Sequence, residues 1–222
     1  MAFSTSAKNR LTRHDLDRFA GTSLFDRLAR AVCEAGCLPR KELYEAWEVA
    51  RRVRRLFRGG RVVDVAGGHG LLAHTMLLLD DSSPDAHVVD PSPSSSAPRL
   101  HEALTSAWPR LAGRVHWTAA ALDAFRFEAG DVIVSSHACG SLTDFVLDHA
   151  LAVHARVAVL PCCHDARTSD AGQLTGWVDP ALAIDLLRAV RLQDSGYRVR
   201  TQTIPAAITP KNRLLIGAPL ER

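Results

Sequence analysis

Apolar residues near the start of the chain recur at three- and four-residue spacing. Between residues 16 and 56 they stand first at Leu24, Phe25, Leu28 and Ala31, then at Leu43, Trp47 and Ala50. This spacing places apolar side chains on one face of an α-helix. We therefore predict an N-terminal helical cap over residues 1–58, followed by a second unit over residues 59–222.

After the pair Gly59-Gly60 the pattern changes to short β-branched runs that alternate with helical stretches. The predicted strands span residues 61–65, 86–90, 114–118, 131–135, 156–160, 197–204 and 213–216. Helices are predicted near residues 71–79, 98–108, 142–154 and 180–192. Strands that alternate with helices imply right-handed crossovers and a parallel sheet covered on both faces. The predicted fold class is therefore α/β, with a doubly wound, Rossmann-like sheet of seven strands.

The last two predicted strands are joined differently from the others. Only the eight residues 205–212 separate them, which is too few for a helical crossover. These strands should therefore form a terminal antiparallel hairpin. Such a hairpin is typical of class I methyltransferases and is less expected in a plain dinucleotide-binding domain.

Composition narrows the class of protein further. The chain has 222 residues, 47% of them hydrophobic, which suits one compact domain. It has no apolar run long enough to span a bilayer and no apolar stretch after its first charges, so we expect a cytoplasmic protein without a membrane partner. Five cysteines without a secretory signal argue against a disulfide framework. The net charge of +3 is too small to indicate a nucleic-acid binder, and the oligomeric state stays open.

A glycine-rich segment follows the first predicted strand and precedes a helix. Asp64, Ala66, Gly68 and Gly70 occupy alternate positions in it, with Gly67 between them. Such a turn lets the backbone approach a nucleotide-like cofactor closely at the carboxyl end of a strand. An acidic residue followed by small residues at every second position is the form typical of S-adenosylmethionine-dependent methyltransferases, although Ala66 stands where glycine is usual. Asp90 ends the second strand with a carboxylate suited to both ribose hydroxyls.

The same segment also fits the dinucleotide NAD. Residues 68–73 match G-x-G-x-x-[GA], and Asp90 would serve NAD equally well. Asp64, the terminal hairpin and the lack of a further stretch of roughly 100 residues for a substrate domain favour S-adenosylmethionine. After the third strand, Leu122 and Asp123 stand where such enzymes commonly contact adenine, although Asp123 is equally suited to cap a helix.

Two polar segments follow the fourth and fifth predicted strands, which should be neighbours in the sheet. The first reads SSHACG from Ser135 and continues to Asp144, and the second reads PCCH from Pro161. Both should emerge above the methyl group of the cofactor, with Ser136 among the cofactor contacts. Two histidines and three cysteines would then converge on one pocket.

These segments resemble a family of class I methyltransferases that carry a His-x-Cys-Gly…Thr-Asp motif and a later Cys-Cys-His, a family that includes the tRNA 2'-O-methyltransferase domain. The likeness covers roughly residues 40–217 and rests on His137, Cys139, Gly140, Thr143, Asp144, Cys162, Cys163 and His164, alongside Asp64, Gly68 and Gly70. It implies a Rossmann-like fold, S-adenosylmethionine and methyl transfer. The Cys-His-type zinc-finger segments that accompany the tRNA enzymes are absent from the sequence, so the resemblance leaves the substrate open.

The chemistry expected at these strand ends is alignment and proton transfer. Because S-adenosylmethionine already carries a strong leaving group, the protein mainly aligns the nucleophile and excludes water. A hydroxyl nucleophile benefits from a base, and His137 or His164 titrates in the right range. Asp144 is expected to orient or assist that imidazole. The alternative for Asp144 is an ordinary carboxylate near a helix N-terminus.

A zinc site is the alternative interpretation of the same side chains. Thiolates and imidazoles from His137, Cys139, Cys162 and His164 could complete a four-coordinate site. However, adjacent Cys162 and Cys163 do not easily chelate one ion together, and the sequence contains no Cys-x-x-Cys pair. The spacing therefore favours S-adenosylmethionine without a metal.

Candidate substrate contacts lie outside the strand ends. Lys211 and Asn212, in the hairpin connection, could hold an anionic or amide substrate, or simply form a β-turn. Tyr44, on the cap, could close over the cofactor or only pack. Six arginines crowd residues 51–61 and could bind RNA phosphates, although pairing with neighbouring glutamates is favoured.

The sequence thus predicts a methyltransferase that acts on O or N of a small-molecule or RNA substrate. Two rival interpretations stay open, an NAD-linked oxidoreductase and a non-catalytic, methyltransferase-like domain that binds RNA or regulates.

Overall fold

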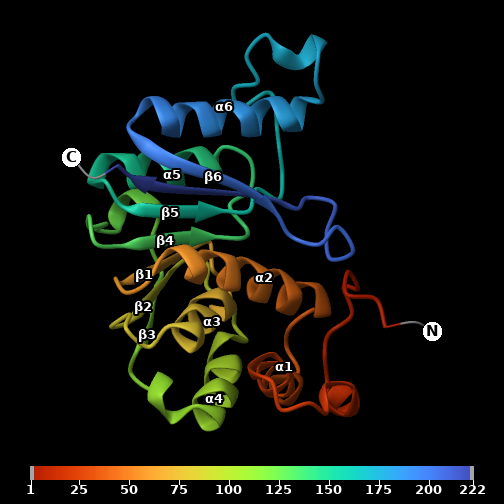
Figure 1. The fold of residues 1–222 in the computed structure, drawn as a ribbon. Coiled ribbons are helices and arrows are strands. Elements are labelled where there is room, and N and C mark those ends of the chain that lie inside the picture. The colour runs from red at the N-terminus through yellow and green to blue at the C-terminus, as the bar shows by residue number, and fades with distance from the viewer. Residues whose placement is uncertain (1–2, 221–222) are drawn as a thin grey trace.

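The N-terminal part of the chain is helical, as its apolar spacing predicts. The computed structural model describes residues 3–220 and shows the 3-10 helix η1 (Arg13–Phe19) and the α-helices α1 (Leu24–Ala35) and α2 (Arg40–Leu56) (Figure 1). The side chain of Ser23 accepts a hydrogen bond from the backbone of Asp26 and begins α1, and Gly36 ends it at φ +60°. The predicted helical cap is confirmed.

The rest of the chain alternates strands and helices. The strands are β1 (Val62–Val65), β2 (Ala86–Val89), β3 (Val115–Thr118), β4 (Val132–Ser135), β5 (Arg156–Val159), β6 (Tyr197–Thr203) and β7 (Arg213–Pro219). The helices between them are α3 (Leu71–Leu79), α4 (Ala97–Ala107), α5 (Leu142–Val153) and α6 (Pro180–Asp194), with short 3-10 helices η2 (Pro109–Leu111), η3 (Leu122–Ala124) and η4 (Leu174–Gly176). Each strand predicted from the sequence is present, with bounds that differ by a few residues at most.

Within residues 3–220 the seven strands form one sheet in the order β3-β2-β1-β4-β5-β7-β6. The first five are parallel, with Val63 beside His87 on one side and beside Ile133 on the other. β7 runs antiparallel to β5 and to β6, and so lies between them. The predicted terminal hairpin is therefore confirmed, and its second strand completes the sheet against β5.

Alternate residues of β1, β4, β5 and β7 enter two separate cores. Val62, Val132 and Ile216 belong to the core under α1 to α4, whereas Val63 and Ile133 belong to the core under α5 and α6. Burial of both faces explains why the central strands read as continuous runs of apolar residues instead of alternating ones. It also fixes Asp64 on the α3 face, two positions from Val62.

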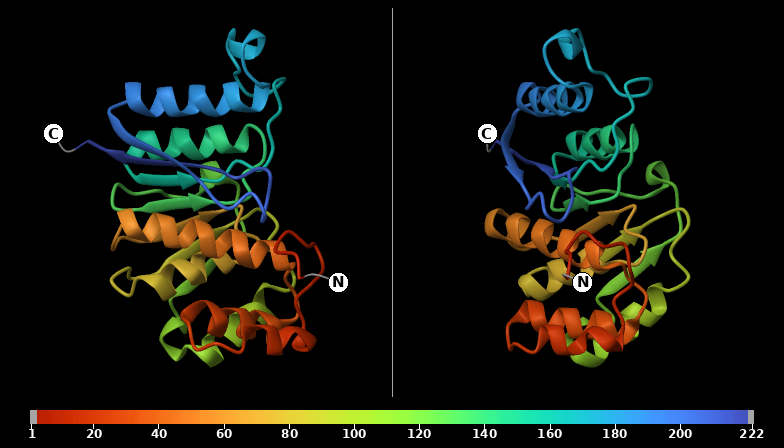
Figure 2. Two further views of the ribbon diagram at one scale, coloured as in Figure 1. Left: turned by 45° about the vertical axis from the view of Figure 1, so that its right-hand side comes forward. Right: turned by 90° about the vertical axis from the view of Figure 1, so that its right-hand side faces the viewer.

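The cap shares its core with the sheet. α1 packs against α4 and α2 packs against α3, and buried residues of the cap such as Leu28, Leu43 and Val49 form one apolar cluster with Leu100 and Val132. Figure 2 shows the cap helices alongside this face of the sheet. The boundary at residue 58 therefore separates the cap in sequence but does not divide the core.

The connection between β5 and α6 stands out from the sheet. It spans residues 160–179, contains η4, and rises above α6 in Figure 1, with Trp177 89% exposed at its end. None of the helices in residues 3–220 is long and apolar enough to cross a membrane.

Candidate functional site

The glycine-rich segment makes a tight turn between β1 and α3. Gly68 and Gly70 have φ values of +50° and +75°, which L side chains rarely adopt. Gly67 is needed for a different reason, since a Cβ there would lie 2.8 Å from the carboxyl group of Asp64 and 2.8 Å from Val88. Ala66 also has a positive φ, +54°, and is therefore a strained residue where the usual motif has glycine.

Asp64 lies beneath this turn with only 1% of its surface exposed. Its Oδ2 accepts a hydrogen bond of 3.1 Å from the backbone amide of Ala73, in the first turn of α3. Burial raises the pKa of Asp64 to about 7, and the nearby charge of Asp90 adds to the rise while the bond from Ala73 opposes it. A cationic ligand beside Asp64 would stabilise the ionised carboxylate and so offset the free-energy cost of burying it.

Asp90 closes the turn from the end of β2. Its Oδ2 accepts from the backbone amide of Gly68 at 3.1 Å, and its Oδ1 accepts from the amide of Ser92 at 2.8 Å. Each carboxylate oxygen can accept a further hydrogen bond. The structure therefore holds Asp90 in a fixed orientation at the place where the sequence predicts a ribose contact.

A cavity of about 200 Å³ opens between the glycine turn, α2 and the end of β4. Its lining includes the predicted residues Asp64, Ala66, Gly67, Gly68, Ser136 and His137, together with Glu42, Ala46, His69, Leu71 and Leu72. Sequence reasoning missed Glu42 and His69. It chose Tyr44 on the same helix, two positions and about 200° away from Glu42.

The titratable side chains of this cavity are carboxyl groups and imidazoles. Burial and the neighbouring charge of Glu45 raise the pKa of Glu42, while Lys41 opposes the rise. Partial loss of hydration lowers the pKa of both His69 and His137, so both imidazoles are neutral at pH 7. Nδ1 of His69 lies 3.9 Å from Oε2 of Glu42. No lysine or arginine belongs to the lining of this cavity among the described residues.

The buried hydroxyl of Ser135 positions the end of β4 beside the glycine turn. Ser135 Oγ donates to the carbonyl of Val65 at 2.7 Å and accepts from the amide of Ala138 at 3.0 Å. The bond to Val65 ties β4 to the end of β1, so Ser136 and His137 face the cavity from a fixed loop. Sequence reasoning quoted Ser135 but gave it no role.

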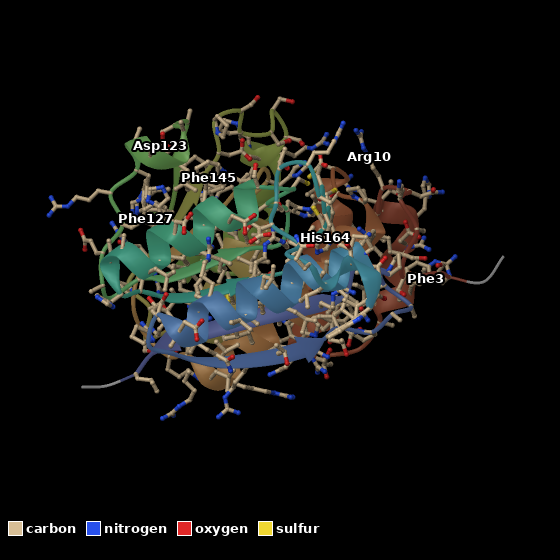
Figure 3. The ribbon with its side chains drawn as sticks, turned by 90° about the horizontal axis from the view of Figure 1, so that it is seen from above. Phe3, Arg10, Asp123, Phe127, Phe145 and His164 are labelled. Carbon is tan, nitrogen blue, oxygen red and sulfur yellow. The ribbon has the colours of Figure 1, made fainter. Side chains whose placement is uncertain are left out.

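Asp144 and His164 are engaged elsewhere, in an ion-pair network between α5, α6 and the loop after β5. Arg188 donates to both oxygens of Asp144, at 2.9 and 2.7 Å, and Ser169 donates to it at 3.1 Å. His164 Nε2 lies 2.8 Å from Oδ1 of Asp185, beside α6 (Figure 3). Burial disfavours the charged form of Asp144, but the bonds from Arg188 outweigh it and hold its pKa below the usual range.

The three predicted catalytic residues are therefore not brought together. His137 lines the cavity, whereas Asp144 and His164 do not. Asp144 makes its hydrogen bonds with Arg188 and Ser169, so the expectation that it orients an imidazole finds no such contact among the described residues.

The predicted metal ligands also separate. His137 and His164 point to different surroundings, but Sγ of Cys139 lies 2.8 Å from Sγ of Cys162, which lies 3.9 Å from Sγ of Cys163. These three sulfurs lie within 4.8 Å of one another. The sequence indicated that adjacent Cys162 and Cys163 do not easily chelate one ion together, and the structure places both of their thiols near that of Cys139.

The predicted adenine and substrate contacts lie outside the cavity. Leu122 is buried in the core under α5, and Asp123 is exposed, at the upper left of Figure 3. Tyr44 packs against Phe25, with ring centroids 5.2 Å apart. Asn212 Nδ2 donates to the carbonyl of Ile204 at 3.0 Å and closes the hairpin, while Lys211 is exposed beside it.

The arginine-rich run 51–61 is largely taken up by internal contacts. Arg54 is 2% exposed, pairs with Asp80 at 3.1 Å and donates to Ser83 at 2.7 Å. Burial lowers its pKa to about 10. Arg51 and Arg52 pair with Glu48, as the sequence favoured, and Arg61 pairs with Asp131 at 2.8 Å.

No protein-family model matches the chain. Over 123 residues it is 26% identical to a glutathione S-transferase C-terminal domain-containing protein of Xenopus laevis, an alignment that covers 39% of this chain and 20% of that protein. The chain thus spans about a fifth of that relative.

Solved structures share the fold over nearly the whole chain. An O-methyltransferase family protein from Burkholderia thailandensis has a TM-score of 0.53 and 19% identity, with 92% of this chain and 62% of that one covered. The S-adenosylmethionine-dependent methyltransferase SibL has a TM-score of 0.52 and 19% identity, with 96% and 66% covered. The fold is that of these methyltransferases. The chain spans less than two thirds of the length of either, and at this identity the likeness extends to the fold alone.

Proposed function

We propose that the chain is a methyltransferase that binds S-adenosylmethionine at the glycine turn and transfers its methyl group to O or N of a small-molecule or RNA acceptor. The observation that carries this proposal is the pair of carboxyl groups, Asp64 and Glu42, in a cavity at the N-terminal end of α3. S-adenosylmethionine supplies a methyl group activated by a cationic sulfonium, and its methionine end carries an ammonium group. Two carboxylates stabilise such cationic groups.

The same carboxyl groups disfavour NAD. In a dinucleotide-binding fold the anionic pyrophosphate lies at the glycine turn, on the N-terminus of the following helix. Here that position faces Asp64, which is 1% exposed, and Glu42, with no lysine or arginine in the described lining. The antiparallel β7 between β5 and β6 also departs from the order 3-2-1-4-5-6 of the dinucleotide fold.

Within this proposal each residue of the site has a role. Asp90, already held by the amides of Gly68 and Ser92, accepts hydrogen bonds from the ribose hydroxyls. His137 is neutral at pH 7 and lies at the cavity, so it can accept the proton of an acceptor hydroxyl as the methyl group is transferred. Ser135 holds the loop that positions it.

Calorimetry on the full chain separates the two cofactors. We expect S-adenosylmethionine and S-adenosylhomocysteine to bind and NADH not to bind. Glu42→Gln should lower the affinity for S-adenosylmethionine by roughly tenfold, because it removes one charge-assisted contact. Glu102→Gln, on the exposed face of α4, should leave this affinity unchanged. Tight binding of NADH without binding of S-adenosylmethionine would overturn the proposal.

The acceptor class is identified by transfer of a labelled methyl group in fractionated cell extract, which separates RNA, protein and small molecules. His137→Gln should abolish most of the transfer while it leaves the affinity for S-adenosylmethionine unchanged. Full transfer by the variant would exclude His137 as the base.

A further inference from the structure

Three thiols gather at the carboxyl edge of the sheet. Cys139 lies in the loop after β4, and Cys162 and Cys163 lie in the loop after β5. Because β4 and β5 are neighbouring parallel strands, with Ser135 beside Val159, both loops leave the sheet at the same edge. The sulfurs of Cys139 and Cys162 are 2.8 Å apart, those of Cys162 and Cys163 are 3.9 Å apart, and the set lies within 4.8 Å.

Backbone contacts hold the two loops in this arrangement. The amide of Gly140 donates to the carbonyl of Cys163 at 3.2 Å, which joins the loops directly. The buried guanidinium of Arg188 donates to the carbonyl of Gly140 at 2.9 Å, and Gly140 itself has a φ of +58°. The thiols are thus presented by a fixed frame on both sides of the cluster.

The spacing of the sulfurs suits a common ion. Thiolates bound to one tetrahedral metal ion at about 2.3 Å lie about 3.8 Å from each other. The pair Cys162 and Cys163 already has this separation, and Cys139 needs to move by about 1 Å from Cys162 to match it. Cys139 and Cys162 are free thiols, since their sulfurs are 2.8 Å apart and a disulfide bond is about 2.05 Å long.

The surroundings of the cluster leave room for an ion to enter and to keep an open coordination position. Cys139 and Cys163 are exposed and Cys162 is half-buried. His164, the next residue along the chain, turns away to Asp185 and does not take part. Three sulfur ligands and one open position match the coordination of soft metal ions.

We infer that Cys139, Cys162 and Cys163 form a binding site for one soft, thiophilic metal ion. Binding replaces three S–H bonds with three sulfur–metal bonds and releases three protons to solvent, without a change in oxidation state. The occupied site would tie the loop after β4, which carries His137, to the loop after β5. The inference rests on the cysteine geometry alone and is independent of the cofactor proposed above.

Anaerobic titration of the fully reduced, tag-free protein with Cd²⁺ tests the site. We expect a thiolate-to-cadmium charge-transfer absorption that saturates at one ion per chain, with release of about three protons. Three fewer thiols should then react with a thiol reagent, and Mg²⁺, which prefers oxygen ligands, should give no signal.

Single variants distinguish the site from a disulfide. Cys163→Ser should lower the affinity for Cd²⁺ by at least about 100-fold, because loss of a direct ligand costs more than loss of an outer-shell partner. Cys37→Ala, in the cap, should leave the affinity for Cd²⁺ unchanged. The inference is overturned if Cys163→Ser binds Cd²⁺ as the parent protein does. It is also overturned if the reduced protein shows no charge-transfer band while Cys139 and Cys162 form a disulfide on mild oxidation.

Discussion

Asp64 is a carboxyl group that is buried without a cationic partner among the described residues, so its ionisation costs the folded protein free energy. Its pKa of about 7 lies above the unfolded value near 3.8, so the folded state binds this proton more tightly. Its contribution to stability is therefore present at low pH and is lost as the pH rises from about 4 to about 7.

Asp64→Asn should remove this pH dependence. We expect the unliganded variant to gain up to about 4 kcal/mol relative to the parent protein at pH 8, and little at pH 4, since three pKa units correspond to about that free energy. Urea denaturation at both pH values measures it, with the exposed Asp123→Asn as control. The same variant should bind S-adenosylmethionine less tightly, and equal affinity would remove Asp64 from the cofactor site.

Ala66 stores backbone strain in the glycine turn, since its φ is +54°. Ala66→Gly should raise the free energy of unfolding by about 0.5–1 kcal/mol, because glycine adopts this conformation without a Cβ clash. His154 has the same φ at the end of α5, away from the cavity, and His154→Gly is the matched control. Both variants should gain stability in denaturant titrations, and a loss in Ala66→Gly would show that the methyl group contributes packing that outweighs the strain.

At the scale of elements, the network around Arg188 fastens α5 to α6. Arg188 is 2% exposed and bridges Asp144, Asp185 and the carbonyl of Gly140. Hydrogen bonds from His164 and Arg213 also hold the pKa of Asp185 below its usual range, against the effect of burial. Both carboxylates therefore stabilise the fold above their unfolded pKa values, and this contribution is lost as the pH falls below about 4.

This network predicts that Asp144 is a structural residue. Asp144→Asn should lower the free energy of unfolding by about 1–3 kcal/mol, since the buried Arg188 loses one of its two charged partners. Asp148→Asn, one turn later and paired with Arg191 at the surface, should change it by under about 1 kcal/mol. Chemical denaturation measures both. If Asp144→Asn keeps its stability but loses turnover at saturating cofactor, the catalytic role expected from the sequence is restored.

The sequence was informative where local pattern decides the structure. The span 71–79 was predicted as a helix and forms α3 with the same bounds, and the short connection 205–212 correctly indicated the hairpin. Asp64 and His137 were placed together because strand ends of a doubly wound sheet meet at one edge. The sequence did not single out Glu42, because the packing of α2 against α3 decides which face of α2 lies beside the glycine turn.

The side-chain contacts of Asp144 and His164 depend on partners far along the chain. Arg188 and Asp185 lie on α6, and no local pattern near residues 144 or 164 indicates that this helix will supply their contacts. The proximity of Cys163 to Cys139 is different, because it follows from the neighbouring positions of β4 and β5 that the sequence already predicted. Tertiary packing therefore decided which of the motif residues remain available for chemistry.

At the scale of the whole molecule, the arginines of residues 51–61 serve stability more than they offer a surface for RNA. Arg54→Glu should unfold the protein, because it places a charge of the wrong sign beside Asp80 in a buried site. Arg55→Glu, on the exposed side of α2, should change stability by under about 0.5 kcal/mol. Thermal denaturation separates the two. Only the Arg55 variant can test RNA binding, and a nuclease-sensitive complex that it weakens would favour an RNA acceptor.

The continuous core predicts that the cap and the sheet unfold together. Leu28 in α1 and Ile133 in β4 are both fully buried, and Leu28 shares an apolar cluster with Val132 and Val134 of the same strand. Leu28→Ala should therefore lower the free energy of unfolding of the whole chain by about 2–5 kcal/mol. Ile133→Val should lower it by about 0.5–1.5 kcal/mol, in the same single transition. Tryptophan fluorescence reports on four tryptophans, among them Trp47 in the cap and Trp117 in β3, and far-ultraviolet circular dichroism reports on the whole fold. Coincident midpoints by both probes in both variants are expected from one cooperative unit. An early transition confined to Leu28→Ala would instead show that the cap unfolds separately, and α2, which carries Glu42, would then be free to leave the glycine turn without unfolding the sheet.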